Sequence, residues 1–187
     1  HQAAQVEPGA MAAVIGLNQQ QVEQVCQECS QAESVVVAAN LNSDSQIVVA
    51  GHVSAVALAQ DQCLKLGAKL AKKLDVSIAS HSPLMQSAVA PLAEKIQGIS
   101  WHELKTPVLS NVTAQLQRQA TEIKANLCSQ LTSPVNWRGC LCFLQQQGVS
   151  NYYELGPGRV LCGLLKRSQP QATAVSCSST SIIDEII

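Results

Sequence analysis

The chemistry of this chain starts with His81, one of only four histidines, which stands between two serines in V-S-I-A-S-H-S-P-L-M (76–85). Imidazole is the side chain best suited to take and return a proton near neutral pH. Ser80 and Ser82 are poor nucleophiles for it, because neighbouring side chains in an extended segment point to opposite faces. A Ser-His pair needs a serine brought close by the fold and a third group that orients the ring. His81 is therefore either a general base with a distant nucleophile or a structural histidine.

The strongest sequence mark of such a serine in α/β enzymes is G-x-S-x-G, and the chain does not contain it. G-I-S-W-H (98–102) and G-V-S-N-Y (148–152) come nearest, and both lack the final glycine. The turn Gly156-Pro157-Gly158-Arg159 resembles a phosphate-binding turn, but its spacing fits neither a dinucleotide fingerprint nor a P-loop. A tight strand-to-helix turn is favoured there, although the helix N-terminus could still face an anion.

Two further groups of residues, lysines and cysteines, each allow a structural and a functional interpretation. Lys65, Lys69, Lys72 and Lys73 place four positive charges within nine residues, which indicates a solvated face or a docking surface for an acidic partner. Cys26-x-x-Cys29 suggests zinc, but no second half-site follows at finger spacing. Buried, reduced thiols of a cytoplasmic protein are the favoured interpretation of the eight cysteines. We expect no metal and no cofactor.

Composition limits the classes of protein. The 187 residues are 47% apolar but only 3% aromatic, so the core must be built from Ala, Val, Leu and Ile in packed layers. The formal charge of −1 argues against a nucleic-acid binder, and no apolar run approaches the roughly 20 residues of a membrane span. H-Q-A-A-Q-V-E-P-G at the start indicates a chain entered in its middle.

The elements that must position His81 form two halves. Strands are predicted at 9–17, 35–40, 46–50 and 69–78, with helices at 19–33, capped by Asn18, and 53–66, stopped by Gly67. This βαββαβ order is the ferredoxin-like pattern. The later half alternates helices (84–97, 121–130, 135–147, 159–167, 180–187) with short strands (107–111, 152–155, 173–176). Three parallel strands make a poor free-standing sheet, so we expect this half to belong to a larger one.

Six ordered blocks then give a resemblance: G-A-M-A-A-V-I-G-L, A-N-L-N-S-D-S-Q-I-V-V-A-G, V-S-I-A-S-H-S-P-L-M, P-V-L-S-N-V-T-A, Q-L-T-S-P-V-N-W and Y-Y-E-L-G-P-G-R-V-L-C-G-L-L-K-R. In order and spacing the chain resembles the C-terminal two-thirds of the bacterial malonyl-CoA:acyl carrier protein transacylases of fatty-acid synthesis. The resemblance implies an α/β protein with a ferredoxin-like small subdomain (5–77) and the C-terminal portion of a hydrolase-like α/β subdomain (78–187).

The resemblance also implies roles for single residues. His81 matches the family's catalytic histidine, which takes the proton of a serine and later protonates the thiol of CoA. Gln130 matches the residue whose main-chain carbonyl orients that histidine. Asn40, Asn42 and Ser80 match positions near the acyl pocket. The nucleophilic serine of a G-H-S-x-G elbow and the carboxylate-binding arginine lie upstream of His1 in the family, so we expect the chain alone to be inactive.

The implied reaction moves a malonyl group from malonyl-CoA to the phosphopantetheine thiol of acyl carrier protein. Because carrier proteins are acidic, the lysine cluster and Lys166-Arg167 become candidate docking residues. The missing N-terminal part of the large subdomain is the other expected partner, with no nucleic acid and no membrane. Ala79-Ser80-His81 does not decide between malonyl and methylmalonyl. The alternative function is a non-catalytic module that binds carrier protein or another partner.

Overall fold

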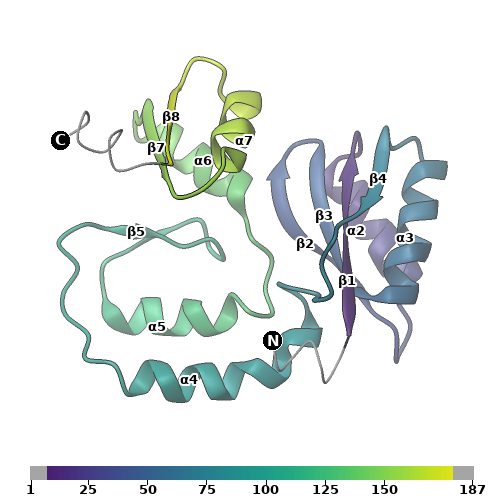
Figure 1. Cartoon of the computed structure of the whole chain (residues 1–187), viewed down its shortest axis with the longest axis horizontal. Helices are drawn as coiled ribbons and strands as arrows, with labels where there is room; N and C mark the ends of the chain where they lie inside the picture. The colour runs from purple at the N-terminus through teal and green to yellow at the C-terminus, as the bar shows by residue number, and fades with distance from the viewer. Residues whose placement is uncertain (1–7, 179–187) are drawn as a thin grey trace. The chain divides into compact units, whose positions relative to one another are not determined.

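A computed structural model describes residues 8–178, and its first half is a four-stranded antiparallel sheet (Figure 1). The predicted helix 180–187 and residues 5–7 of the predicted small subdomain lie outside this range. The elements follow the predicted βαββαβ order: β1 (Gly9–Ile15), α2 (Gln19–Cys29), β2 (Val36–Ser43), β3 (Gln46–His52), α3 (Val53–Lys65) and β4 (Leu70–Lys73). The strands lie in the order β2-β3-β1-β4, which is that of a split βαβ unit.

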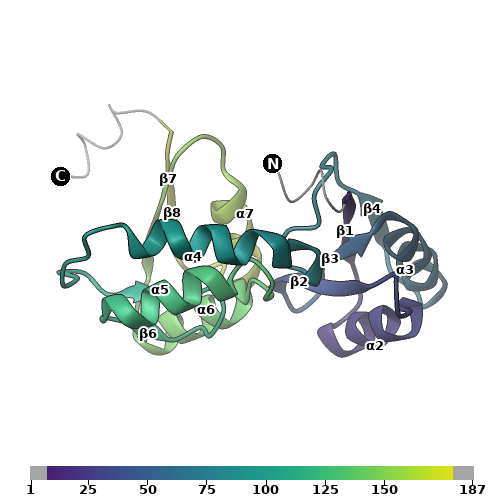
Figure 2. The ribbon, with the colours of Figure 1, turned by 90° about the horizontal axis from the view of Figure 1, so that it is seen from below.

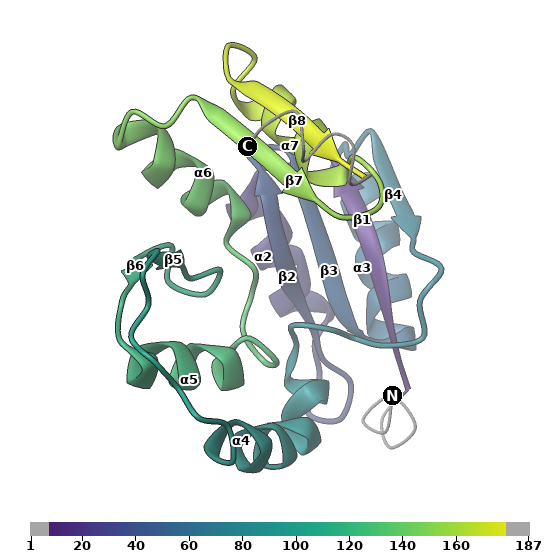
Figure 3. The ribbon, with the colours of Figure 1, turned by 60° about the vertical axis from the view of Figure 1, so that its left-hand side comes forward.

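Alternation along β1 gives the sheet two differently covered faces. Ala10, Ala12 and Val14 pack with α2 and α3 in the main apolar core, and Figure 3 shows both helices on one face of the sheet. Met11 points to the opposite face, where Ala79 and Leu84 belong to a second apolar cluster. The segment that carries His81 is therefore held on the sheet face that α2 and α3 leave open.

The ends of the first helices follow their local chemistry. Asn18 caps α2 as predicted: its side chain accepts from the Gln21 N–H at 2.9 Å, while the Gln21 side chain accepts from the Asn18 N–H at 3.0 Å. The helix stops at Cys29 rather than at residue 33, because Ser30 is extended and its hydroxyl bonds to the backbone of Val36. Gly67 follows α3 with φ +100, as expected of a helix stop.

The predicted strand at 69–78 is wrong beyond Lys73. β4 pairs with β1 only from Leu70 to Lys73, and a single further bond joins the Leu74 N–H to the Met11 carbonyl. Asp75, Val76 and Ser77 are exposed and irregular. The apolar character of this run comes from the separated anchors Leu74 and Ala79 rather than from a continued strand.

The segment after His81 is helical but differs in detail from prediction. It contains a 3₁₀ helix η1 (Pro83–Ala88), then α4 (Val89–Gln97), β5 (Val108–Leu109), β6 (Leu116–Gln117) and α5 (Ala120–Ser129). Helices α4 and α5 pack side by side (Figure 2). The strand expected at 107–111 does not join a parallel sheet: it pairs antiparallel with β6. The Ser110 hydroxyl accepts from the Val112 and Thr113 N–H groups, and Ala114 has φ +53, which turns the chain back.

The chain divides into two compact units, one up to Trp137 and one from Arg138 onward. The subdomain boundary predicted between residues 77 and 78 is a different division of the chain, and it stays a prediction. The second unit contains most of α6 (Trp137–Gln146), then β7 (Asn151–Leu155), α7 (Val160–Ser168) and β8 (Thr173–Cys177). β7 and β8 pair in parallel, as predicted. In residues 8–178 no helix combines the length and apolar character needed to cross a membrane.

Candidate active site

His81 sits in a tight turn between β4 and η1, and its backbone is unusual. Its φ is +62, a left-handed conformation that non-glycine residues rarely adopt. The side chain is half-buried, and Ala79 and Leu84 on either side of it are buried in the apolar cluster on the sheet. The turn that carries the imidazole is therefore anchored on the sheet by its two buried neighbours.

The ring is oriented by a main-chain carbonyl. Nδ1 of His81 lies 2.7 Å from the Gln130 carbonyl oxygen and 3.5 Å from the Gln130 side-chain nitrogen. A carbonyl oxygen can only accept, so the short contact requires a proton on Nδ1. The lone pair of the neutral ring is then on Nε2, which is the arrangement a general base needs. The carbonyl predicted to orient His81 therefore lies within hydrogen-bond distance of the ring, and its role in catalysis stays a prediction.

Gln130 is available for this bond because of its place on α5. It caps the C-terminus of the helix, where the last carbonyls have no partner within the helix. The N–H groups that follow turn back to earlier carbonyls, with Leu131 bonding to Cys128 and Ser133 to Ser129. The Gln130 carbonyl is left without a partner inside the helix, and it accepts the hydrogen bond from His81.

The loop after Gln130 is tied to the edge of the sheet at a second predicted residue. The Leu41 N–H donates to the Val135 carbonyl and the Val135 N–H to the Ala39 carbonyl, both at 2.8 Å. This forms a parallel bridge between Asn40 and Val135, at a bulge in β2. Asn40 therefore adjoins the loop that carries Gln130. Asn42 lies further along β2 and Ser80 precedes His81, and both are half-buried.

The predicted lysine cluster does not share one face. Lys65, Lys69, Lys72 and Lys73 are all exposed. Lys73 pairs with Ala12, which packs on the α2/α3 face, whereas Lys72 pairs with Ala13 and lies on the same face as Leu74 and Ala79. Of the two strand lysines, Lys72 alone lies on the sheet face of the His81 turn.

Lys166 and Arg167 lie at the end of α7, in the second unit. The Lys166 ammonium donates to the Ala172 carbonyl and so closes the connection from α7 to β8. That contact gives Lys166 a structural task in addition to any docking role, and a charge change there would disturb both.

The possible anion site at Gly156-Pro157-Gly158 is already filled by the chain. The Glu154 carboxylate accepts from the Leu161 N–H at 3.0 Å and from the Cys162 N–H at 2.8 Å, at the start of α7. These backbone N–H groups, that of Cys162 most, hold the pKa of Glu154 below its ordinary value. Sequence reasoning missed this cap, whose one signal was an acidic residue at the end of the strand before the turn.

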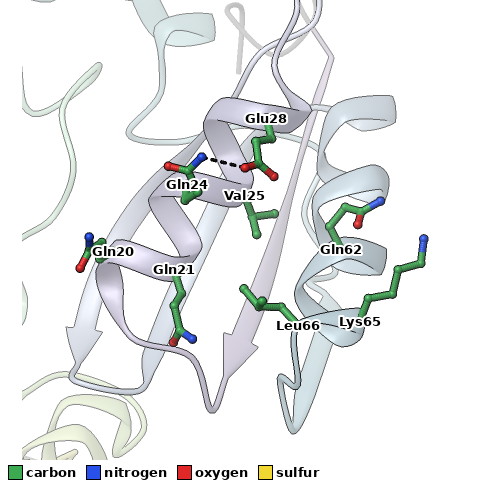
Figure 4. Close-up of a pocket in the computed structure, with 8 residues that line it drawn as sticks. All are labelled: Gln20, Gln21, Gln24, Val25, Glu28, Gln62, Lys65 and Leu66. Carbon is green, nitrogen blue, oxygen red and sulfur yellow. Dashed lines mark hydrogen bonds between the residues drawn. The ribbon is translucent and has the colours of Figure 1, made fainter.

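A groove of about 480 Å³ runs between α2 and α3 (Figure 4). Half of its lining residues are glutamines of the two helices, Glu28 and Lys65 also line it, and Gln24 donates to Glu28 at 2.7 Å. Because these helices cover the opposite face of the sheet from Ala79, the groove is separate from the turn that carries His81.

None of the eight cysteines forms a disulfide in the described residues, and six of them are buried. Cys26 and Cys29 face the core below α2 beside Cys63 of α3, and burial raises the pKa of Cys26 to about 12 and that of Cys63 to about 11. Such thiols stay protonated and serve as small apolar groups. Between residues 8 and 178, no three Cys, His, Asp or Glu side chains are grouped as metal ligands.

Comparison with known proteins identifies related sequences and structures. The chain is 39% identical over 173 residues to the malonyl CoA-acyl carrier protein transacylase of Escherichia coli (strain K12), a match of 92% of this chain and 56% of the relative. It superimposes on the malonyl CoA-acyl carrier protein transacylase of Coxiella burnetii with a TM-score of 0.93 at 38% identity, covering 100% of this chain and 60% of that one. No protein-family profile matches.

A third relative was solved with a partner. It is a malonyl-transacylase in complex with a type II polyketide synthase acyl-carrier protein, and it matches 97% of this chain and 60% of its own with a TM-score of 0.91 at 37% identity. The chain thus spans little more than half of the length of the relatives it matches.

Proposed function

Because the chain is a homologue of the malonyl CoA-acyl carrier protein transacylases over little more than half of their length, we propose that it supplies the general base of a malonyl transfer. The transfer runs from malonyl-CoA to the phosphopantetheine thiol of acyl carrier protein, in fatty-acid biosynthesis. The observation that carries the proposal is the 2.7 Å contact between His81 Nδ1 and the Gln130 carbonyl, which leaves Nε2 as the basic atom.

In this mechanism His81 moves one proton twice. Nε2 takes the proton of an attacking hydroxyl as that oxygen bonds to the malonyl carbonyl carbon. The imidazolium then returns the proton to the sulfur of CoA as the carbon–sulfur bond breaks, which leaves an acyl ester. The second half runs in reverse with the carrier thiol. The Gln130 carbonyl, with the negative end of α5 behind it, faces the ring while the ring is positively charged.

The attacking hydroxyl is proposed to come from the part of the relatives that this chain does not match. Its own 187 residues contain no G-x-S-x-G elbow. Asn40, Asn42 and Ser80 are proposed to line the acyl pocket, with malonyl as the acyl group. A cytoplasmic location is supported by eight cysteines that form no disulfide, since thiols persist in reducing compartments.

Two measurements test the proposal. The chain alone, incubated with malonyl-CoA, should show no malonyl adduct by intact mass. When it is joined to the uncovered part of the Escherichia coli relative, transfer to acyl carrier protein should appear, and His81→Ala should lower its rate about 10²–10⁴-fold. His102→Ala, at an exposed histidine, is the matched control. A stable adduct on the chain alone, or full transfer by His81→Ala, would contradict the proposal.

The second candidate function, a non-catalytic module that binds carrier protein, is distinguished by the same joined protein. It predicts binding of the carrier without any transfer. The existence of a homologue solved in complex with an acyl-carrier protein makes such binding a fair expectation in either case.

Carrier docking has its own test in two adjacent lysines. We expect Lys72→Glu to weaken binding of acyl carrier protein by about tenfold, because a carrier that brings its thiol to His81 approaches the face on which Lys72 lies. Lys73→Glu changes charge equally on the opposite face and should have a smaller effect. Equal losses in a titration at low salt would instead indicate attraction by net charge alone.

A further inference from the structure

We propose that Ser82 is a positioning residue for His81, and that its buried hydroxyl holds the turn in the left-handed conformation that aims the ring. The consequence for catalysis rests on the proposed function of His81 as base. The geometric part of the inference does not, because it concerns only how the turn is held.

The Ser82 hydroxyl bonds to a carbonyl that precedes it in the chain. Ser82 has no exposed surface, and its Oγ donates to the Ala79 carbonyl at 2.6 Å. Ser82 is also the N-cap of η1, where a serine side chain usually accepts from an N–H of the first turn. Here it makes no such cap bond. Its hydrogen-bonding capacity is directed backwards, across the four residues from Ala79 to Ser82.

Those four residues contain His81 at the third position. A β-turn with a positive φ at its third residue normally has glycine or asparagine there, because a β-carbon is strained in that conformation. His81 has φ +62. The hydroxyl spans the same four residues that a β-turn's backbone hydrogen bond spans, and so opposes the tendency of His81 to relax to a negative φ.

The acceptor of this bond belongs to a residue that is packed against the sheet. Ala79 is 1% exposed and packs with Met11 and Leu84. It also lies so close to the start of β1 that a β-carbon on Gly9 would come within 2.5 Å of the Ala79 side chain. The Ser82 bond therefore ties the turn to the sheet, while Gln130 holds the ring from the end of α5. Without the Ser82 bond, the His81 ring that donates to Gln130 would be held less firmly.

The test reads the tautomer of His81 in the 187-residue chain by ¹⁵N NMR of labelled histidine, at a pH where the ring is neutral. In the wild type, Nδ1 should carry the proton and exchange it slowly with water. Ser82→Ala should raise the population with the proton on Nε2 and speed exchange at Nδ1 by about tenfold, the factor that one buried hydrogen bond is worth. Ser87→Ala, an exposed serine in η1, is the matched control and should match the wild type.

Each outcome decides the inference. An unchanged tautomer in folded Ser82→Ala overturns it, and a lower melting temperature with an unchanged tautomer reduces Ser82 to an ordinary buried residue. If Ser82→Ala does not fold, Ser82→Cys, which is similar in size but a weaker donor, should show a smaller change in the same direction. No change there also overturns it. Because malonyl transfer is not measured, failure of the proposed function leaves this result intact.

Discussion

At the scale of single residues, the left-handed backbone of His81 has a measurable energetic consequence. Replacement by glycine relieves roughly 1–2 kcal/mol of strain in the folded state. The greater conformational freedom of glycine in the unfolded chain offsets about 0.5–1 kcal/mol of this gain. His81→Gly should therefore be more stable than His81→Ala by about 0.5–1 kcal/mol in urea unfolding. Both variants lose the bond to Gln130, so that loss cancels in the comparison.

His102 provides the control for this prediction, because it is exposed and does not share the positive φ of His81. His102→Ala should therefore be more stable than His102→Gly, because glycine gives the unfolded chain more freedom. If alanine is also the more stable residue at position 81, the turn does not store the strain that its dihedral angle indicates.

The pairing of His81 with Gln130 could be anticipated only from resemblance, since 49 residues separate them and no spacing rule links a turn to a helix end. The left-handed turn was not foreseeable. The apolar run before His81 favoured a continued strand. The strand prediction is wrong there because Ala79 packs against Gly9, and this is a tertiary contact that the local sequence does not show. The contact of Ser82 is local, with a backbone carbonyl three residues earlier, but a serine hydroxyl can bond to several nearby backbone groups and the sequence does not say which.

At the scale of elements, α7 depends on the carboxylate that caps it. The backbone N–H groups of Cys162 and Leu161 lower the pKa of Glu154 in the folded protein. A group with a lowered folded pKa stabilises the fold above its ordinary pKa, and the contribution is lost as pH falls through the folded value. The stability of the second unit should thus decline on acidification below the ordinary range of a glutamate.

Glu154→Gln tests this cap. The amide keeps an oxygen acceptor but carries no charge at any pH, so the variant should be less stable near neutrality and show a flatter stability profile in acid. Thermal melting followed between neutral and acidic pH measures both effects, and Glu103→Gln, at an exposed position in a loop, controls for the change of net charge. Parallel pH profiles for Glu154→Gln and the wild type would remove the carboxylate from the account.

The order of elements in the first half was readable because each signal was local. Asn18 indicated the start of α2, and Gly67 indicated the end of α3. The pairing of the later strands was not local. P-V-L-S-N has the composition of a buried strand, yet the turn at Ser110 folds it onto β6. Only the pairing of β7 with β8 across α7 followed the expected α/β pattern.

At the scale of the whole molecule, the second unit has an apolar surface that its own residues leave exposed. Leu155 is 73% exposed and Val160 is 71% exposed, and Tyr153 lies two residues before Leu155 on the same face of β7. Glu154 points the other way, to α7. Large apolar side chains that stay exposed in and just after a strand are typical of an interface. The proposed occupant is the part of the fold that the relatives have and this chain does not match.

This assignment predicts opposite effects of one change in two settings. In the 187-residue chain, Leu155→Ser with Val160→Ser should reduce concentration-dependent self-association in sedimentation velocity, because less apolar surface is exposed to water. In the protein joined to the uncovered part of a relative, the same pair should lower stability, because the side chains are then buried. Leu58→Ser, at an exposed leucine of α3, should do neither. A neutral effect of the pair in the joined protein would show that this face is solvent-exposed there too, and the part of the relatives that this chain does not match would have to cover another surface.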